Sequence, residues 1–429
     1  MKRAKPKSAP APEQTAEPRL YELLGPGLIT GASDDDPSGI ATYSQVGAQF
    51  GYGIGWTLIF TYPLMCAIQL ISAQIGRVTG HGIAGNLRRY YPPALLYSLI
   101  TLFIAANIIN LAADLGAMGD ALKLLIGGPR ILYVVAFAAV SVTLEIFISY
   151  KRYVSVLKWL TLSLFAYVAT LFTVHVPWKT LTLQLLWPHI SLTSDYLTAV
   201  VAVFGTTISP YLFFWQATAE VERQRNIPGP DALRRTPNLA PAEMRRMKLD
   251  TYIGMFFSNF VGLFIVLTTA ATLNAHGVTD IQTSAQAAEA LKPLAGPLAY
   301  TLFSCGIIGT GLLALPVLAG SAAYAVGEVF KWPVGLSRQF GKARNFYLVI
   351  TLATLVGVAL NFTHLDPIKA LFWSAVINGL AAVPIMAMLM LMACNKKVMG
   401  KFTLTPALKF WGWLSTALMA LVAAGMFIG

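Results

Sequence analysis

Three consecutive carboxylates, followed by a proline and a glycine, interrupt a segment that is otherwise apolar. The run reads Asp34-Asp35-Asp36-Pro37-Ser38-Gly39 and lies within residues 23–50. Proline breaks a helix, and a charged aspartate at the centre of a bilayer costs roughly 2.5–3.5 kcal/mol. Irregular backbone is tolerated at membrane depth only where it is buried in protein or lines a water-filled cavity. We therefore expect this run to bind a cation, with Asp36 as the anchoring ligand and Asp34 and Asp35 as ligands or lining of the vestibule.

A second interruption falls in the apolar segment 194–222. It reads Gly205-Thr206-Thr207-Ile208-Ser209-Pro210-Tyr211. Thr206 and Ser209 are three residues apart and share a helical face, so their hydroxyls, or carbonyls freed by the break, are candidate oxygen ligands. A serine in a membrane helix also bonds back to a carbonyl of the preceding turn, and this alternative stays open. Gly39 either leaves room beside the ion or serves helix packing.

The composition is that of a membrane protein with many crossings. Of its 429 residues, 56% are hydrophobic and 12% charged, whereas a soluble domain carries about 25% charged residues. Eleven apolar segments are long enough to cross a hydrocarbon core of about 30 Å. They lie near 23–50, 53–76, 95–125, 131–150, 153–175, 194–222, 250–274, 297–330, 345–361, 367–394 and 406–428. The fold class predicted is an all-α protein spanning a lipid bilayer.

The net charge is +12, and the positions of the basic residues agree with a membrane topology. With the N-terminus inside, most lysines and arginines fall in the cytoplasmic loops, and the outer loops hold only a few (Arg130, Lys179, Lys292 and Lys369). This distribution obeys the positive-inside rule, so the basic excess does not indicate binding to nucleic acid. We expect a plasma-membrane protein with a cytoplasmic N-terminus and an outside C-terminus. Residues 1–19, rich in Lys, Pro and Ala, are expected to form a disordered basic tail.

The two interruptions fall at matching places in two halves of the chain. Five crossings separate them, so the two broken segments enter the membrane from opposite sides. Two halves of five segments with opposite topology, each opening with a broken helix, are typical of secondary transporters built from inverted repeats. We predict a first repeat over 20–175, a second over 194–394, and an additional helix over 406–428.

The glycine-rich run Gly25-Pro-Gly-Leu-Ile-Thr-Gly31, followed by Asp36-Pro37, resembles the Nramp family of divalent-metal transporters. In that family the first helix carries Asp-Pro-Gly-Asn and the sixth carries Met-Pro-His. Ser209-Pro210-Tyr211 is the best match to the second motif. The resemblance implies a LeuT-type fold of two inverted five-helix repeats with helices 1 and 6 broken. It also implies a divalent cation as the transported substrate.

Two motif positions differ from that family in a way that changes the ligand chemistry. The family asparagine is Gly39, and the methionine whose thioether contacts transition metals is Ser209. A sulfur ligand favours Mn, Fe and Cd, whereas Mg²⁺ prefers oxygen and keeps several of its waters. This pattern resembles the Nramp-related magnesium transporters, which carry Mg²⁺ and also Mn²⁺. A glutamine ligand of the tenth helix is also lost near Ala375, and Asn378, one turn further on, is a candidate to replace it.

The residues that would carry protons in the resembled family are also changed. Tyr211 replaces the motif histidine, and of the acidic pair on the third helix only Asp114 is present, since the second position is Ala117. A tyrosine with an ordinary pKa near 10 does not shuttle protons near neutral pH. We expect no strict proton coupling. The membrane potential alone supplies a divalent cation with roughly 4.6 kcal/mol per 100 mV.

Other chemistry finds little support in the sequence. Glu145, Glu220, Glu222 and Glu328 are expected in exposed ion pairs at inner helix ends, with Glu220 and Glu222 as alternatives for lining an inner exit. HExxH, GxGxxG and P-loop patterns do not occur in the sequence, so neither a zinc hydrolase nor an ATP-driven pump is indicated. We expect no enzyme activity, no cofactor and no obligate protein partner.

The sequence therefore predicts a secondary transporter that imports partly hydrated divalent cations, with Mg²⁺ preferred and Mn²⁺ accepted. One alternative is a proton-coupled Mn²⁺/Fe²⁺ importer with a relay rewired through Asp114. Another is a sodium–amino acid symporter of the same fold, which needs a free helix N-terminus for the substrate carboxylate. The three aspartates oppose such an anionic group.

Overall fold

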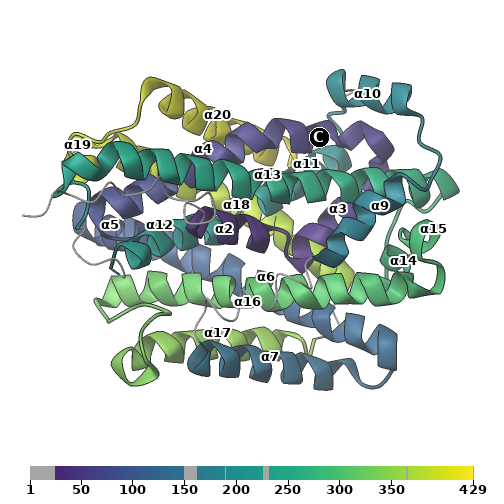
Figure 1. Cartoon of the computed structure of the whole chain (residues 1–429), viewed down its shortest axis with the longest axis horizontal. Helices are drawn as coiled ribbons and strands as arrows, with labels where there is room; N and C mark the ends of the chain where they lie inside the picture. The colour runs from purple at the N-terminus through teal and green to yellow at the C-terminus, as the bar shows by residue number, and fades with distance from the viewer. Residues whose placement is uncertain (1–24, 149–161, 189, 226–230, 364–365, 429) are drawn as a thin grey trace, which may run out of the picture.

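The helices of the protein run alongside one another in an elongated bundle (Figure 1). The structure is a computed structural model that describes residues 25–148, 162–188, 190–225, 231–363 and 366–428. Within these ranges the regular structure is helical, and no strand occurs. The predicted tail over 1–19 lies outside the described residues.

Eight helical spans in the described residues are long and apolar enough to cross a membrane. One of them, Ser194–Arg225, consists of two helices, α11 (Ser194–Thr207) and α12 (Pro210–Arg225). The others contain α4 (Trp56–Thr79), α6 (Pro93–Ile126), α7 (Arg130–Phe147), α13 (Ala240–Thr272), α16 (Ala299–Phe330), α18 (Pro367–Cys394) and α20 (Pro406–Gly425). Each coincides with a predicted segment.

The other predicted crossings lie on shorter helices. The first is split into α2 (Pro26–Asp34) and α3 (Pro37–Phe50), which confirms the predicted break. The ninth is α17 (Arg344–Leu360), whose 17 residues span about 25 Å. The fifth is described only over Leu162–Leu171, as η2 (Leu162–Leu164) and α9 (Phe165–Leu171). Its start, over 153–161, lies outside the described residues.

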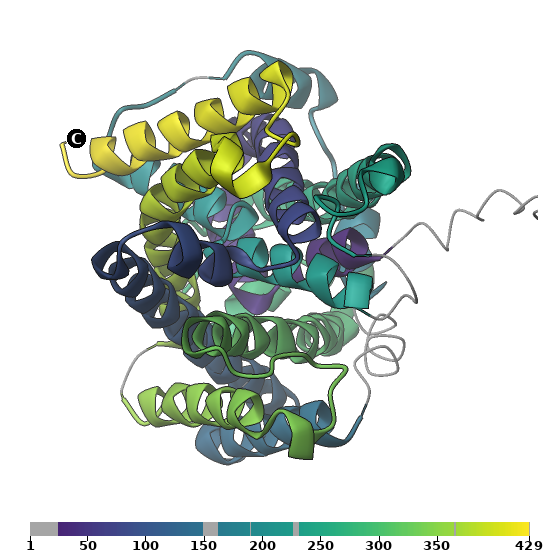
Figure 2. The ribbon, with the colours of Figure 1, turned by 90° about the vertical axis from the view of Figure 1, so that its left-hand side faces the viewer.

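The broken helices occupy the middle of the bundle. Figures 1 and 2 place α2 and α3 between α4 and α20 on one side and α16, α17 and α7 on the other. In the most apolar stretch of the α11–α12 span 89% of the residues are buried, compared with 22% for α7 and 28% for α20. The outer helices therefore present apolar side chains to lipid, and the broken ones are enclosed by protein.

Small residues bring the backbones of the broken helices close to their neighbours. A Cβ added to Gly31 of α2 would lie 2.2 Å from the carbonyl oxygen of Gly254 on α13. A Cβ on Gly205 of α11 would lie 2.0 Å from the carbonyl oxygen of Ala375 on α18. Membrane helices gain no hydrophobic free energy from associating with one another, so close packing through small residues holds them together. These contacts hold α2 against α13 and α11 against α18.

Several elements differ from the sequence-based prediction. α13 begins at Ala240, whereas the apolar run predicts a start at 250. The prediction misses the first turns because they are charged and lie outside the apolar run. Short helices also connect the spans: α5 (Ile83–Tyr90), α10 (Trp178–Leu186), α14 (Ser284–Glu289), α15 (Lys292–Ala295) and α19 (Lys396–Met399). The charged start of α13 makes the ion pairs described below.

Candidate functional site

The two helix breaks lie against each other in the core. α2 ends at Asp34 and α3 begins with Pro37, while α11 ends at Thr207 and α12 begins with Pro210. Proline fits the first position of a helix because no partner is needed there for its missing N–H. A Cβ on Gly39 would lie 3.1 Å from Thr206 Oγ1 and 3.2 Å from the Asp34 carbonyl oxygen. Gly39 therefore keeps open the space between the two breaks.

Asp36 is held in one orientation by three donors. Its Oδ1 accepts a hydrogen bond from the Gly39 backbone N–H at 2.7 Å, which caps α3. Its Oδ2 lies 3.0 Å from Asn110 Nδ2 and 3.1 Å from the Tyr211 hydroxyl. That hydroxyl is also 3.0 Å from the Ser33 carbonyl oxygen, and its single proton serves one acceptor at a time. The carboxylate is 2% exposed and keeps a lone pair on Oδ1 for a further contact.

Asp34 and Asp35 are buried beside Asp36. They are 0% and 6% exposed, and both carboxylates approach the hydroxyl of Ser258 on α13. Asp34 Oδ1 has no hydrogen-bond partner. None of the three aspartates forms an ion pair with a lysine, arginine or histidine in the part of the chain that the structure describes. The break thus concentrates negative charge that the described side chains do not balance.

Ser209 stabilises the second break. Its hydroxyl lies 2.9 Å from the Thr206 carbonyl oxygen and 2.5 Å from that of Gly205, both at the end of α11. These carbonyls lose their helical partners where α11 ends, and a serine that bonds back to the preceding turn satisfies one of them. Because the hydroxyl donates its proton to the helix, its lone pairs stay available to a cation. Thr206 and Ser209 are 3% and 1% exposed.

A chain of buried amides connects Asp36 to α6 and α18. Asn378 on α18 donates to Asn110 Oδ1 at 2.9 Å, and Asn110 in turn donates to Asp36. Asp114 Oδ2 lies 3.3 Å from Asn110 Nδ2. The structure thus brings Asn378 and Asp114 toward the site through Asn110, and neither contacts Asp36 directly by a hydrogen bond.

Asn110 and Ser258 are functional candidates that the sequence analysis missed. Asn110 precedes Asp114 by four residues, so the two share a face of α6, and that spacing was a signal in the sequence. Ser258 lies in the middle of an apolar span without a neighbouring motif. Within the described ranges, no group of three or more His, Cys, Asp or Glu side chains has the geometry of a metal centre.

A second polar cluster fastens the start of α2. Asp250 on α13 accepts hydrogen bonds from the backbone N–H groups of Gly25, Gly27 and Leu28 at 2.8, 2.8 and 3.0 Å. Carboxylates at a helix N-terminus satisfy unpaired donors and complement the helix dipole. The carboxylate also lies 3.7 Å from Arg246. α2 is therefore tied to α13 at the end of the bundle that we expect to face the cytoplasm.

Arg246 continues this cluster into α12 and α4. It forms an ion pair with Glu220 and a second one with Glu243 at 3.3 Å, and Glu243 also pairs with Arg77 at 3.2 Å. Glu220 is 0% exposed and Arg246 5%. The expectation of an exposed ion pair is therefore wrong for Glu220, because the early start of α13 covers it with an arginine.

Among the residues that the structure describes, the other three glutamates form no exposed ion pair. Glu145 is 7% exposed and accepts a hydrogen bond from Ser141 at 2.9 Å. Glu222 accepts from Tyr324 at 2.6 Å, and Glu328 accepts from the backbone N–H of Gly82 at 2.6 Å. In the described part of the chain these carboxylates accept hydrogen bonds from hydroxyl and backbone donors in place of the expected ion pairs.

Comparison with known proteins identifies similar sequences and folds. The family model named Natural resistance-associated macrophage protein-like (Nramp) matches residues 27–429. A manganese transporter from Eremococcus coleocola, solved in complex with an aromatic bis-isothiourea substituted compound, is similar with a TM-score of 0.74 and 19% identity. That match covers 95% of this chain and 87% of the other.

Two more distant structures share the fold. Mhp1, a nucleobase-cation-symport-1 family transporter, matches with a TM-score of 0.56 and 13% identity over 94% of this chain and 92% of its own. MhsT in complex with L-phenylalanine matches with a TM-score of 0.57 and 14% identity over 94% and 97%. The predicted LeuT-type fold, with broken helices 1 and 6, is confirmed.

Replacing Arg246 by glutamine tests the cluster that holds α2. The change leaves Glu220 buried without its ion-pair partner, and breaking a buried pair costs about 3–5 kcal/mol. We expect Arg246→Gln to lower the midpoint of thermal unfolding in detergent clearly, while Arg245→Gln, at an exposed neighbouring position, leaves it unchanged. Equal midpoints for the two variants would show that the cluster does not stabilise the bundle.

Proposed function

This chain belongs to the Nramp family and is a divalent-metal transporter that crosses the membrane several times, and we propose that it imports Mg²⁺, accepts Mn²⁺ and needs no strict proton coupling. The observation that carries the proposal is the buried set of Asp34, Asp35 and Asp36 at the junction of the two helix breaks. They are buried and form no ion pair with a described lysine, arginine or histidine, which is compatible with a site that a cation completes.

The geometry around Asp36 supports a partly hydrated ion. The carboxylate is oriented by Gly39, Asn110 and Tyr211 before an ion arrives, so binding does not have to order it. It then offers one direct contact, and Asp34 Oδ1 offers another that is not used within the protein. Mg²⁺ gives up its waters reluctantly and is bound through one or two carboxylates. In the proposed site the remaining ligands are waters held by Thr206, Ser209 and nearby carbonyls.

The donor types favour Mg²⁺ over softer metals. The groups that orient Asp36 or face it from the second break are carboxylate, hydroxyl, phenol, amide and backbone groups. Oxygen ligands suit Mg²⁺ and Mn²⁺, whereas thioether and thiolate ligands select softer ions. Ser209 stands at the position of the family methionine. The proposed site therefore lacks the thioether that would favour Mn²⁺ over Mg²⁺.

The hydrogen bonds of Tyr211 support transport without proton coupling. The phenol lies between Asp36 and the Ser33 carbonyl, so it serves to hold the first break in place. In the proposed mechanism, the membrane potential drives the divalent ion inward. A second candidate is a proton-coupled Mn²⁺/Fe²⁺ importer. It is favoured by Asp114, which is buried and reaches Asp36 through Asn110.

Alternating access is proposed to move α2, α3, α4, α11, α12 and α13 as one body against the other helices. Close backbone contacts join α4 to α12, since a Cβ on Gly76 would lie 2.0 Å from the Ala217 carbonyl oxygen, and the equally close contact of Gly205 in α11 with Ala375 in α18 is where the two bodies slide past each other. α13 is joined to α2 through Gly254 and Gly31. Asp250 of α13 also holds the start of α2, so the two helices stay together when the protein opens toward the cytoplasm. The plasma membrane, the cytoplasmic N-terminus, the outside C-terminus and the absence of an obligate protein partner belong to the same proposal.

Removing the charge of Asp36 is the first test of the site. In proteoliposomes, we expect Asp36→Asn to reduce uptake of both Mg²⁺ and Mn²⁺ about 100-fold. Asn110→Ala, which removes the amide that orients Asp36 and links it to Asn378 and Asp114 but leaves the Asp36 charge, is expected to lose about tenfold. Asp120→Asn is the control, because Asp120 also lies on a membrane helix but bonds to Ser284 outside the site. Uptake that survives Asp36→Asn at the level of this control would exclude the proposed site.

Introducing sulfur at position 209 tests the preference for Mg²⁺. We expect Ser209→Met to raise the ratio of Mn²⁺ or Cd²⁺ uptake to Mg²⁺ uptake at least about tenfold, equivalent to about 1.4 kcal/mol, because a thioether binds the softer ions. Competition between the ions in the same vesicles measures the ratio. Ser209→Ala is the control, since it removes the hydroxyl without adding sulfur. An unchanged ranking in Ser209→Met would contradict the placement of residue 209 beside the ion.

A further inference from the structure

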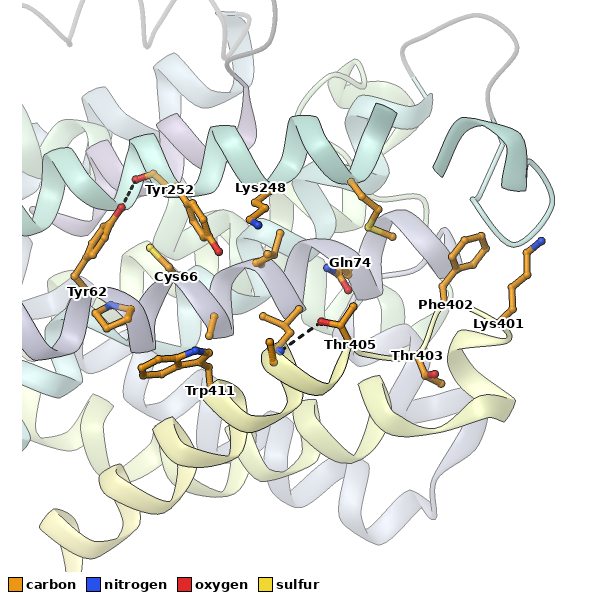
Figure 3. Close-up of a pocket in the computed structure, with 16 residues that line it drawn as sticks. Tyr62, Cys66, Gln74, Lys248, Tyr252, Lys401, Phe402, Thr403, Thr405 and Trp411 are labelled. Carbon is orange, nitrogen blue, oxygen red and sulfur yellow. Dashed lines mark hydrogen bonds between the residues drawn. The ribbon is translucent and has the colours of Figure 1, made fainter. Parts of the chain in front are cut away.

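A groove separate from the transport site opens on the side of the bundle formed by α4, α13 and the start of α20. It has a volume of about 660 Å³ (Figure 3). α4 contains Pro63 at the groove, and a proline inside a helix bends it and removes a backbone hydrogen bond. Trp411 and Tyr252 line the groove and are 38% and 37% exposed, so the groove faces outward from the bundle.

One part of the groove is apolar and aromatic. Tyr62 and Cys66 of α4, Tyr252 of α13 and Trp411 of α20 surround it (Figure 3). The Tyr62 hydroxyl donates to the Tyr252 carbonyl oxygen at 3.2 Å, which joins α4 to α13 across the groove. Cys66 is 4% exposed and Leu70 5%, so the floor is closed by packed side chains. An acyl chain matches such a surface, since it needs no hydrogen bonds.

The other part of the groove is basic. Lys248 extends from α13 into the groove, and Lys401 lies at the far end beyond Phe402 (Figure 3). The Lys248 ammonium is 5.6 Å from the centre of the Tyr252 ring. Over the residues that the structure describes, neither lysine forms an ion pair with a carboxylate. The charge of this part is therefore available to an anion from outside the chain.

We propose that the groove binds one anionic phospholipid of the cytoplasmic leaflet. Its phosphate lies at Lys248, Lys401 adds positive charge at the far end of the groove, and an acyl chain packs along Tyr62, Cys66 and Trp411. Both lysines belong to the end of the bundle expected to face the cytoplasm, where membranes carry anionic lipids, and basic pockets between membrane helices bind such headgroups. Charge complementarity thus favours a lipid over an apolar partner helix, which would leave Lys248 unpaired. The site is independent of the proposed ion selectivity.

Quenching of Trp411 fluorescence by brominated lipids tests the proposal on the full chain. The protein is reconstituted into phosphatidylcholine vesicles that contain increasing fractions of brominated phosphatidylglycerol or of brominated phosphatidylcholine. The signal of Trp411 is the difference between the wild type and Trp411→Phe, since the chain contains nine tryptophans. Each lysine near an anionic surface strengthens binding about fivefold. We therefore expect brominated phosphatidylglycerol to quench Trp411 at a lower mole fraction in the vesicle than brominated phosphatidylcholine does.

Variants separate a lysine-dependent site from general contact with lipid. Lys248→Gln is expected to reduce the preference for phosphatidylglycerol about fivefold, and Lys248→Gln combined with Lys401→Gln to abolish it. Lys342→Gln is the matched control, because Lys342 is exposed in another loop on the same side and lies outside the groove. Equal quenching by both lipids in the wild type would overturn the proposal. An unchanged preference in the double variant, or an absence of quenching because a second copy covers Trp411, would also overturn it.

Discussion

The burial of three adjacent carboxylates in the middle of a membrane protein is the constraint on which the rest of the structure depends. Placing Asp34, Asp35 and Asp36 at this depth costs several kcal/mol unless donors or a cation approach them. The break between α2 and α3 supplies the Gly39 N–H, and α6, α12 and α13 supply Asn110, Tyr211 and Ser258. The donors come from four separate helices, so the site exists only when those helices are packed together.

The position of the site also depends on how the start of α2 is held. α2 ends at Asp34 and is followed directly by Asp35, and its N-terminal end is held by Asp250. The helix is short, with nine residues, and packs against α13 through backbone contact at Gly31 and Gly254. α2 and α13 therefore move together, and their movement relative to α6 separates Asp36 from Asn110, which orients it. In this way the proposed opening to the cytoplasm also disturbs the ion site.

Local signals in the sequence predicted the centre of the structure well. Prolines next to acidic or hydroxyl residues placed both breaks, and Asp36 follows directly from the first of them. Contacts between helices that are distant in the sequence could not be predicted from such local patterns. Glu220 was expected on the surface, yet Arg246 covers it, because α13 starts before its apolar run. Asn378 was expected near the ion, yet it reaches Asp36 only through Asn110. The site residues themselves stay a prediction until transport is measured.

The most direct measurement of the central claim uses purified protein in liposomes that contain a magnesium-sensitive dye and, in a parallel set, a pH dye. A potassium gradient with valinomycin sets the membrane potential. The account predicts Mg²⁺ entry that grows with an inside-negative potential and is not accompanied by acidification. Entry of Mn²⁺ alone, with acidification in proportion, would contradict it and would assign the protein to proton-coupled transport through Asp114.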